Sequence, residues 1–258
     1  MIKFFRHIRQ SLIMENKTAN YIKYAIGEII LVVIGILIAL QINNWNEQNK
    51  ENRLEAEYYC RLLEDAQQDL EQVNQFIKAS EDRLAASNQA VRLLQQEQAK
   101  KVDVSKQLGL SIIAIYSDFT PNNSAFEDLK SGANLNIIKD KHIIKAINNY
   151  FNTVTGYISI IKVNANIALD TYYLDKDVFE SGRIHSQMLT ERFVTGMEKD
   201  VYDLMNLDYE ELLSESMQYR LLNAALTYIS TNARQLQLYN LIKDEVTKLI
   251  ETLEPKCE

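Results

Sequence analysis

The sequence predicts an all-α protein: an N-terminal single transmembrane helix continuing into a long helix that packs in an antiparallel three- or four-helix bundle. Three observations predict this class. The 258 residues include only 7 Gly and 2 Pro, so helices are rarely interrupted. An unbroken apolar run covers residues 29–40, and three later segments repeat apolar residues at alternating spacings of four and three. Nothing reads as a strand, because the β-branched residues occur at helical spacing.

Residues 1–21 are predicted to be a cytoplasmic amphipathic leader. Apolar and basic side chains are interleaved there at helical spacing, which suits a helix lying on an anionic leaflet. A short disordered leader is the alternative interpretation. The apolar members are Ile2, Phe4, Phe5, Ile8, Leu12 and Ile13.

Residues 22–45 are predicted to form the transmembrane helix. The apolar run alone is shorter than the roughly 20 residues that a span needs. Between residues 22 and 42, however, the only strongly polar members are Lys23, Glu28 and Gln41. A cleaved signal peptide is the competing interpretation, but the charged lead-in is too long for one and residues 39–41 make a poor cleavage site.

The flanks of this segment predict its orientation. Tyr21 and Tyr24 precede it and Trp45 follows it, where interfacial aromatic residues are common. Basic residues dominate the N-terminal side, with Glu15 as the one acidic residue. The positive-inside rule therefore places the N-terminus in the cytoplasm. The basic residues are Lys3, Arg6, Arg9, Lys17 and Lys23.

Residues 46–258 are predicted to be an extracytoplasmic helical bundle with a membrane-proximal stalk. The chain carries a net charge of −7, which argues against nucleic acid as a partner. A heptad stripe predicts a first helix over residues 46–98, on the order of 80 Å long. The stripe consists of Tyr59, Leu63, Ala66, Leu70, Val73, Ile77, Ser80, Leu84, Ser87, Val91 and Leu94.

The same heptad frame runs backwards through Trp45, Gly35 and Glu28, which indicates one continuous helix. The stalk, residues 45–58, then extends beyond the other helices and needs other chains to cover it. This motivates the hypothesis of a homo-oligomer joined through a coiled coil.

The later segments complete the bundle. An apolar segment over 103–119 is a possible fourth member, and Ser124 with Glu127 fits a capping box that starts a short helix ended by Gly132. A second long helix is expected from Asp140 to residues 181–182, one short helix within 183–207, and a last long helix from Tyr209 to Leu253. Its stripe is Leu222, Ala225, Ile229, Asn232, Leu236, Tyr239, Val246, Ile250 and Leu253.

Chemistry-bearing patterns are scarce. No nucleophile elbow, phosphate loop or dinucleotide fingerprint occurs, and His7, His142 and His185 have no metal-ligand spacing. We therefore expect no catalytic activity, no cofactor and no metal. Cys60 and Cys257 could pair within the chain or between chains, or remain thiols; the sequence leaves this open.

Glu28 is the residue with the sharpest functional interpretation, because ionisable groups inside a membrane span are functional candidates. It could accept a proton, pair with a cation, or fix the register between helices. Gly27 and Gly35 share a face with Leu31 and permit close approach of a second helix. We favour helix association or structural pairing through Glu28, Gly27 and Gly35 over proton chemistry.

Four segments carry a resemblance to a known family: residues 1–10, residues 24–29, residues 33–46 and the run Ser124–Leu135. They resemble an uncharacterised domain-of-unknown-function family of small single-pass membrane proteins from Bacteroidota-type bacteria. The resemblance implies an inner-membrane protein with a periplasmic helical domain. It supplies no activity, substrate or catalytic residue.

The favoured function is that of a structural or interaction protein, anchored in the lipid bilayer and assembling with itself or with other membrane-protein subunits. A periplasmic ligand-binding or sensory bundle that signals through a partner is the alternative. A pocket lined by tyrosines and an arginine would favour that alternative.

Overall fold

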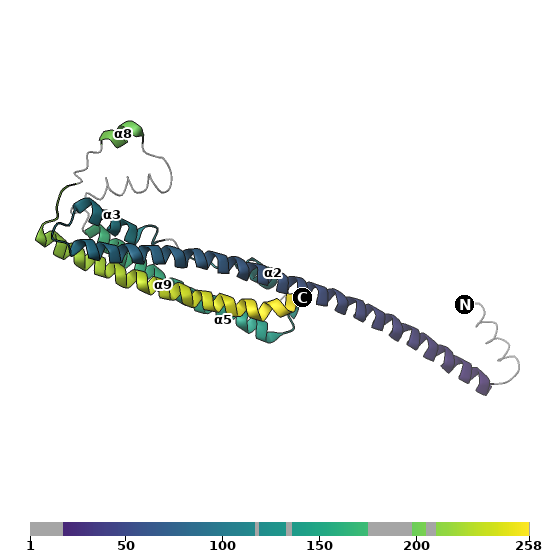
Figure 1. Cartoon of the computed structure of the whole chain (residues 1–258). Coiled ribbons are helices and arrows are strands. Elements are labelled where there is room, and N and C mark those ends of the chain that lie inside the picture. Colours follow the sequence, from purple (N-terminus) through teal and green to yellow (C-terminus); the bar gives the residue numbers. More distant parts are fainter. Residues whose placement is uncertain (1–17, 117–118, 133–135, 175–197, 205–209, 258) are drawn as a thin grey trace. The chain divides into compact units, whose positions relative to one another are not determined.

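The computed structural model describes residues 18–116, 119–132, 136–174, 198–204 and 210–257 (Figure 1). The predicted leader therefore lies largely outside the described residues. Those described form helices and one isolated β-bridge, which confirms the all-α prediction. The helices are α2 (Thr18–Leu94), α3 (Lys101–Ile112), α4 (Ser124–Ser131), α5 (Lys141–Leu174), α8 (Lys199–Leu204) and α9 (Glu215–Cys257).

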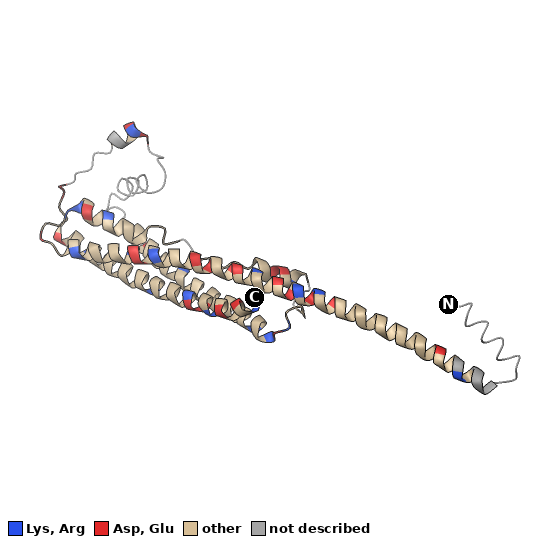
Figure 2. Cartoon of the chain, turned by 45° about the vertical axis from the view of Figure 1, so that its right-hand side comes forward, with Lys and Arg blue, Asp and Glu red and all other residues tan. Residues whose placement is uncertain are grey.

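The chain divides into two compact units, residues 1–56 and 57–258, with the boundary inside α2. In the first unit, residues 29–46 of α2 carry no charged side chain, as Figure 2 shows. Its large apolar side chains are exposed, with Leu31 at 69% and Trp45 at 66%. Within the described part of the chain, α2 alone is long and apolar enough to cross a membrane.

The second unit is built around two hydrophobic cores. The first core includes Tyr59, Val154 and Val246, and the second includes Leu108 and Tyr228. Both α2 and α5 run from the first core to the second. The α3–α4 stretch and α9 run back from the second core to the first, so that the elements alternate in direction. This arrangement is an antiparallel bundle of three long helices, with α3 and α4 together serving as the fourth member (Figure 1).

The predicted stripe of α2 forms its core-facing side. Every member from Tyr59 to Leu94 is buried or half-buried. On α9 one column of the predicted stripe is buried as expected, namely Ala225, Asn232, Tyr239, Val246 and Leu253. The other column was placed one residue too late: Leu221, Tyr228, Gln235, Ile242 and Leu249 are buried, whereas Leu222, Ile229, Leu236 and Ile250 are half-buried. Apolar character favoured Leu236, but Gln235 faces the core because it has buried hydrogen-bond partners there.

Two helix boundaries differ from the prediction, and one backbone pairing lies between them. The first helix ends at Leu94 rather than residue 98, and the last begins at Glu215 rather than Tyr209. Between them Lys100 and Leu212 form an antiparallel bridge. The backbone N–H of Lys101 donates to the Glu211 carbonyl at 2.9 Å, and that of Leu213 donates to the Ala99 carbonyl at 2.9 Å. This pairing requires extended backbone on both sides, so neither helix can continue through it.

The remaining predictions about the connections have mixed outcomes. The capping box is wrong, because Asn123 occupies the N-cap and Glu127 pairs with Lys130 instead. Gly132 is the C-cap of α4, as predicted. One short helix, α8, lies within the range expected to hold one, whereas the expected end of the second long helix at 181–182 lies outside the described residues.

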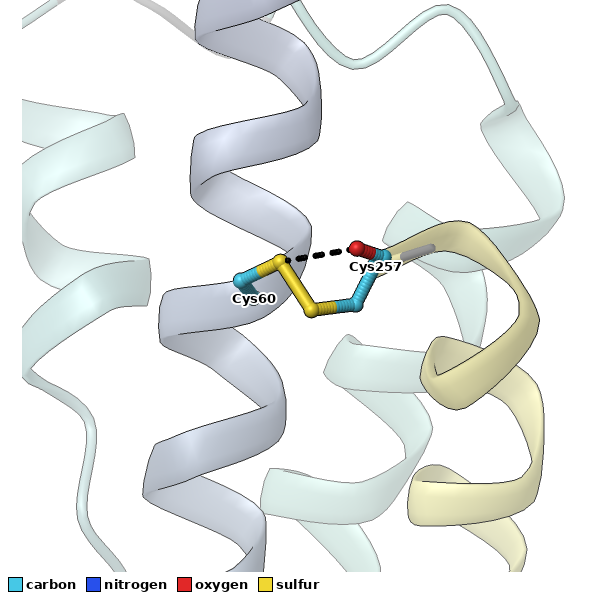
Figure 3. The surroundings of a disulfide bond; sticks show 2 residues. All are labelled: Cys60 and Cys257. Atoms are coloured by element: carbon cyan, nitrogen blue, oxygen red, sulfur yellow. Dashed lines mark hydrogen bonds between the residues drawn. A yellow bond between two sulfur atoms is a disulfide. The ribbon is translucent and has the colours of Figure 1, made fainter.

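Cys60 of α2 and Cys257 of α9 form a disulfide, which settles the question that the sequence left open. Their Cα atoms are 4.8 Å apart, and 197 positions separate them in the sequence. Figure 3 shows the bond linking the two helices, with the Cys60 sulfur 3.3 Å from the Cys257 carbonyl oxygen. The bond therefore closes a loop that contains nearly the whole bundle.

Reducing this disulfide should lower the free energy of unfolding of the bundle by about 2–5 kcal/mol, because the unfolded chain regains the entropy that the long loop had removed. Denaturant titration of the oxidised and reduced full chain measures the difference. The double variant Cys60→Ser/Cys257→Ser should have the same free energy of unfolding as the reduced protein, and added reductant should not change it. A double variant as stable as the oxidised protein would contradict the prediction.

Candidate functional site

The three predicted membrane residues lie on the exposed helix of the first unit. Gly27 and Gly35 have no neighbouring atom within 4 Å of the place where a Cβ would stand. Glu28 lies one residue after Gly27 and is half-buried. With Leu31, the two glycines recur every four residues and thus share one face of α2. This face is open to another helix.

The bundle interior holds a polar layer centred on Arg83, a residue that the sequence analysis did not single out. Arg83 is 3% exposed. Its guanidinium donates to Asn232 Oδ1 at 3.1 Å, to Gln235 Oε1 at 3.0 Å and to Ser80 Oγ at 2.9 Å. The layer therefore joins α2 to α9 through a charged side chain that is almost wholly buried.

The same layer reaches the other helices. Asn232 Nδ2 donates to the Ser111 carbonyl of α3 at 2.8 Å and to Ser87 Oγ of α2 at 3.1 Å. Gln235 Nε2 donates to the Ile161 carbonyl of α5 at 3.4 Å. Consequently α2, α3, α5 and α9 meet in one hydrogen-bonded network between the two apolar cores. A buried network of this kind is compatible with one register of the helices. Sliding any helix would leave polar groups in the apolar interior without hydrogen-bond partners.

A second polar cluster surrounds Asp69, which is fully buried in α2 beside the first core. Tyr150 of α5 donates its hydroxyl to Asp69 Oδ2 at 2.6 Å. Asn122 donates its backbone N–H and its side-chain amide to Oδ1 at 2.8 and 2.9 Å. Burial raises the pKa of Asp69 to about 6, against the opposing effect of these hydrogen bonds. The pKa of Tyr150 is also raised, by burial first and by the neighbouring carboxylate second.

A small cavity adjoins Asp69. Its volume is about 10 Å³, which is room for roughly one water molecule. The lining includes Tyr150 of α5 and Leu249 of α9, together with Asp65 and Asp69 of α2. This hollow is too small for an organic ligand.

The run Ser124–Ser131, part of the last resemblance segment, forms α4 and docks on α2. Asp65 accepts hydrogen bonds from the Ser124 hydroxyl at 2.9 Å and from the Ala125 backbone N–H at 2.9 Å, so a residue of another helix caps α4. Arg61 pairs with Asp128 at 2.7 Å, and Phe126 stacks on Phe151 of α5 at 5.4 Å. Ser124, Asp128 and Phe126 of this segment therefore serve to dock α4 on its neighbouring helices.

Sequence reasoning missed both polar clusters, although the sequence contained a signal for the layer around Arg83. Ser80, Ser87 and Asn232 occupied stripe positions where an apolar residue was expected. Read together, three polar residues inside two apolar stripes indicate a buried polar layer. Arg83 itself gave no such signal, because a lone arginine on a long helix is usually exposed.

Replacing Arg83 with Met should lower the free energy of unfolding by about 2–4 kcal/mol, because Asn232 and Gln235 lose a buried donor. Denaturant titration of the full chain measures this. Arg234→Met is the matched control, since Arg234 is exposed and its guanidinium bonds Gln237 on the same helix. The control should change stability by less than about 0.5 kcal/mol. Equal effects of the two variants would contradict a structural role for the polar layer.

Comparison with known proteins gives a family and no function. No curated protein and no solved structure matches the chain. One family model, described as a family of unknown function (DUF6090), matches residues 28–180. The match begins at Glu28 in the apolar part of α2 and covers α3, α4 and α5. Because it spans more than half of the 258 residues, the chain belongs to this family of unknown function.

Proposed function

We propose that the protein is a structural or interaction protein of a bacterial inner membrane, anchored by residues 22–45, with the bundle in the periplasm. The exposed apolar surface of α2 carries this proposal. Large apolar side chains at more than 50% exposure, such as Leu31, Leu37 and Ile42, are stable only in lipid or against another protein. The bundle packs many of its apolar residues into two cores, but it also exposes large apolar side chains, among them Val163 of α5 at 58% and Tyr219 of α9 at 70%.

Two independent features support the orientation. The basic residues before the apolar segment favour a cytoplasmic N-terminus. The Cys60–Cys257 disulfide favours an oxidising compartment for the bundle, since cytosolic thiols are kept reduced. Charge and redox chemistry thus support the same side of the membrane.

The interaction proposed for the anchor is association with a second copy through the face that carries Gly27, Leu31 and Gly35. Small residues let helix backbones approach closely in lipid, where packing rather than the hydrophobic effect drives association. Glu28 lies beside this face and would fix the register of such a pair. Among the described residues of the bundle, Arg83 is engaged by neighbouring side chains and the hollow beside Tyr150 holds about 10 Å³, so these two features lend no support to the sensory alternative.

The proposed orientation can be tested with two single cysteines and a membrane-impermeant thiol reagent. Glu51→Cys should react in cells whose outer membrane alone is permeable, whereas Ser11→Cys should react only after lysis. The native cysteines remain in their disulfide and do not react. The reverse pattern would place the bundle in the cytoplasm, and release of the protein by an alkaline carbonate wash would contradict the anchor itself.

The proposed association can be tested by oxidative crosslinking in membranes. Leu31→Cys should give a covalent dimer because it lies on the glycine face, whereas Val33→Cys, about 200° further round the helix, should not. Gly35→Ile added to Leu31→Cys should reduce the dimer yield several-fold by preventing close approach. Equal crosslinking at positions 31 and 33, or none at either, would contradict this association surface.

A further inference from the structure

Residues 119–131, here named the docking segment, are held against the bundle by side chains spaced one turn apart on α2. Arg61 bonds Asp128, Asp65 caps α4, and Asp69 binds Asn122. Beneath these polar contacts Phe119 and Leu129 are almost completely buried. The segment therefore combines an apolar underside with a row of polar contacts along a single helix.

Asp69 differs from the other two residues of this row. Arg61 and Asp65 are half-buried, whereas Asp69 has no exposed surface. The groups that face it are Asp65 of α2, Tyr150 of α5 and Asn122 of the docking segment, and α9 contributes the apolar Leu249 beside the cavity. A carboxylate in this position is surrounded by neutral donors and by one further acidic group.

We propose that Asp69 is a proton-dependent latch that holds the docking segment on α2 and α5 more tightly in acid than at neutral pH. One of its donors, Asn122, belongs to the docking segment, so any opening that withdraws this segment also brings water to the Asp69 carboxylate. The cavity next to Asp69 gives the first entering water a place to bind. Docking and burial of the carboxyl group are therefore one event.

The sign of the effect follows from linkage. With the segment docked, the pKa of Asp69 is about 6, and in water it returns to the ordinary value of 3.8. The docked state therefore binds a proton more tightly than the open state. The extra stability of docking is fully present below pH 3.8 and is lost as the pH rises through 6. Between pH 7.5 and pH 5 the docking equilibrium should shift about tenfold towards the docked state.

Hydrogen exchange of the oxidised full chain in detergent, followed by mass spectrometry, tests the latch. Protection factors, corrected for the intrinsic pH dependence of exchange, are compared for amides of the docking segment at pH 5, 6 and 7.5. They should rise about tenfold towards pH 5, whereas amides of α9 around Tyr228 serve as the internal reference. A flat profile in the docking segment would overturn the proposal.

Three variants separate the latch from a structural role of Asp69. Asp69→Asn keeps the shape of the side chain and should abolish the rise. Asp65→Asn, on the same helix face, should lower protection at every pH and keep the rise but move it to lower pH, because the Asp65 charge contributes to the raised pKa of Asp69. Tyr150→Phe removes a hydrogen bond that lowers the pKa of Asp69, so the rise should begin at higher pH. An unaltered rise in Asp69→Asn would assign the effect to another group.

Discussion

The buried guanidinium of Arg83 is the interaction on which the arrangement of the bundle depends. An amphipathic helix can slide along an apolar neighbour by a heptad and still bury leucines and isoleucines. Arg83 removes this freedom, because its hydrogen bonds need Asn232 and Gln235 of α9 at one height. The same Asn232 fixes α3 through the Ser111 carbonyl. The polar layer thereby aligns the first and second cores, which apolar packing alone would not do.

The fold class and the α2 face could be read from the sequence because they depend on periodicity alone. The heptad spacing from Tyr59 to Leu94 indicates which side of the helix is apolar, and the residues on that side are buried or half-buried in the structure. The α9 face could not be read as well, since Gln235 is buried for its partners and not for its hydrophobicity. The role of Asp69 could not be predicted from the sequence either, because its hydrogen-bond partners lie 53 and 81 positions away along the chain.

Predictions from local sequence motifs were wrong where an element distant in the sequence provides the hydrogen-bonding group at a helix end. Ser124 and Glu127 have the spacing of a capping box, but Asp65 of α2 takes the free amide of Ala125 instead. Likewise, no Gly or Pro marks the end of α2 at Leu94. Residues 95–98 turn the chain instead, and residues 99–101 then pair with residues 211–213, more than 100 positions later. In both cases the tertiary contact satisfies backbone groups that local sequence would otherwise have to satisfy.

The two polar centres of the bundle respond differently to their surroundings. A guanidinium stays protonated throughout the physiological pH range, so the register set by Arg83 is constant. Asp69 titrates near pH 6, and the disulfide next to the same first core responds to redox potential. Sensitivity to the medium is therefore concentrated at the first core, where α2, α9 and the docking segment meet. The middle of the bundle, in contrast, is held by a charge that neither acid nor reductant removes.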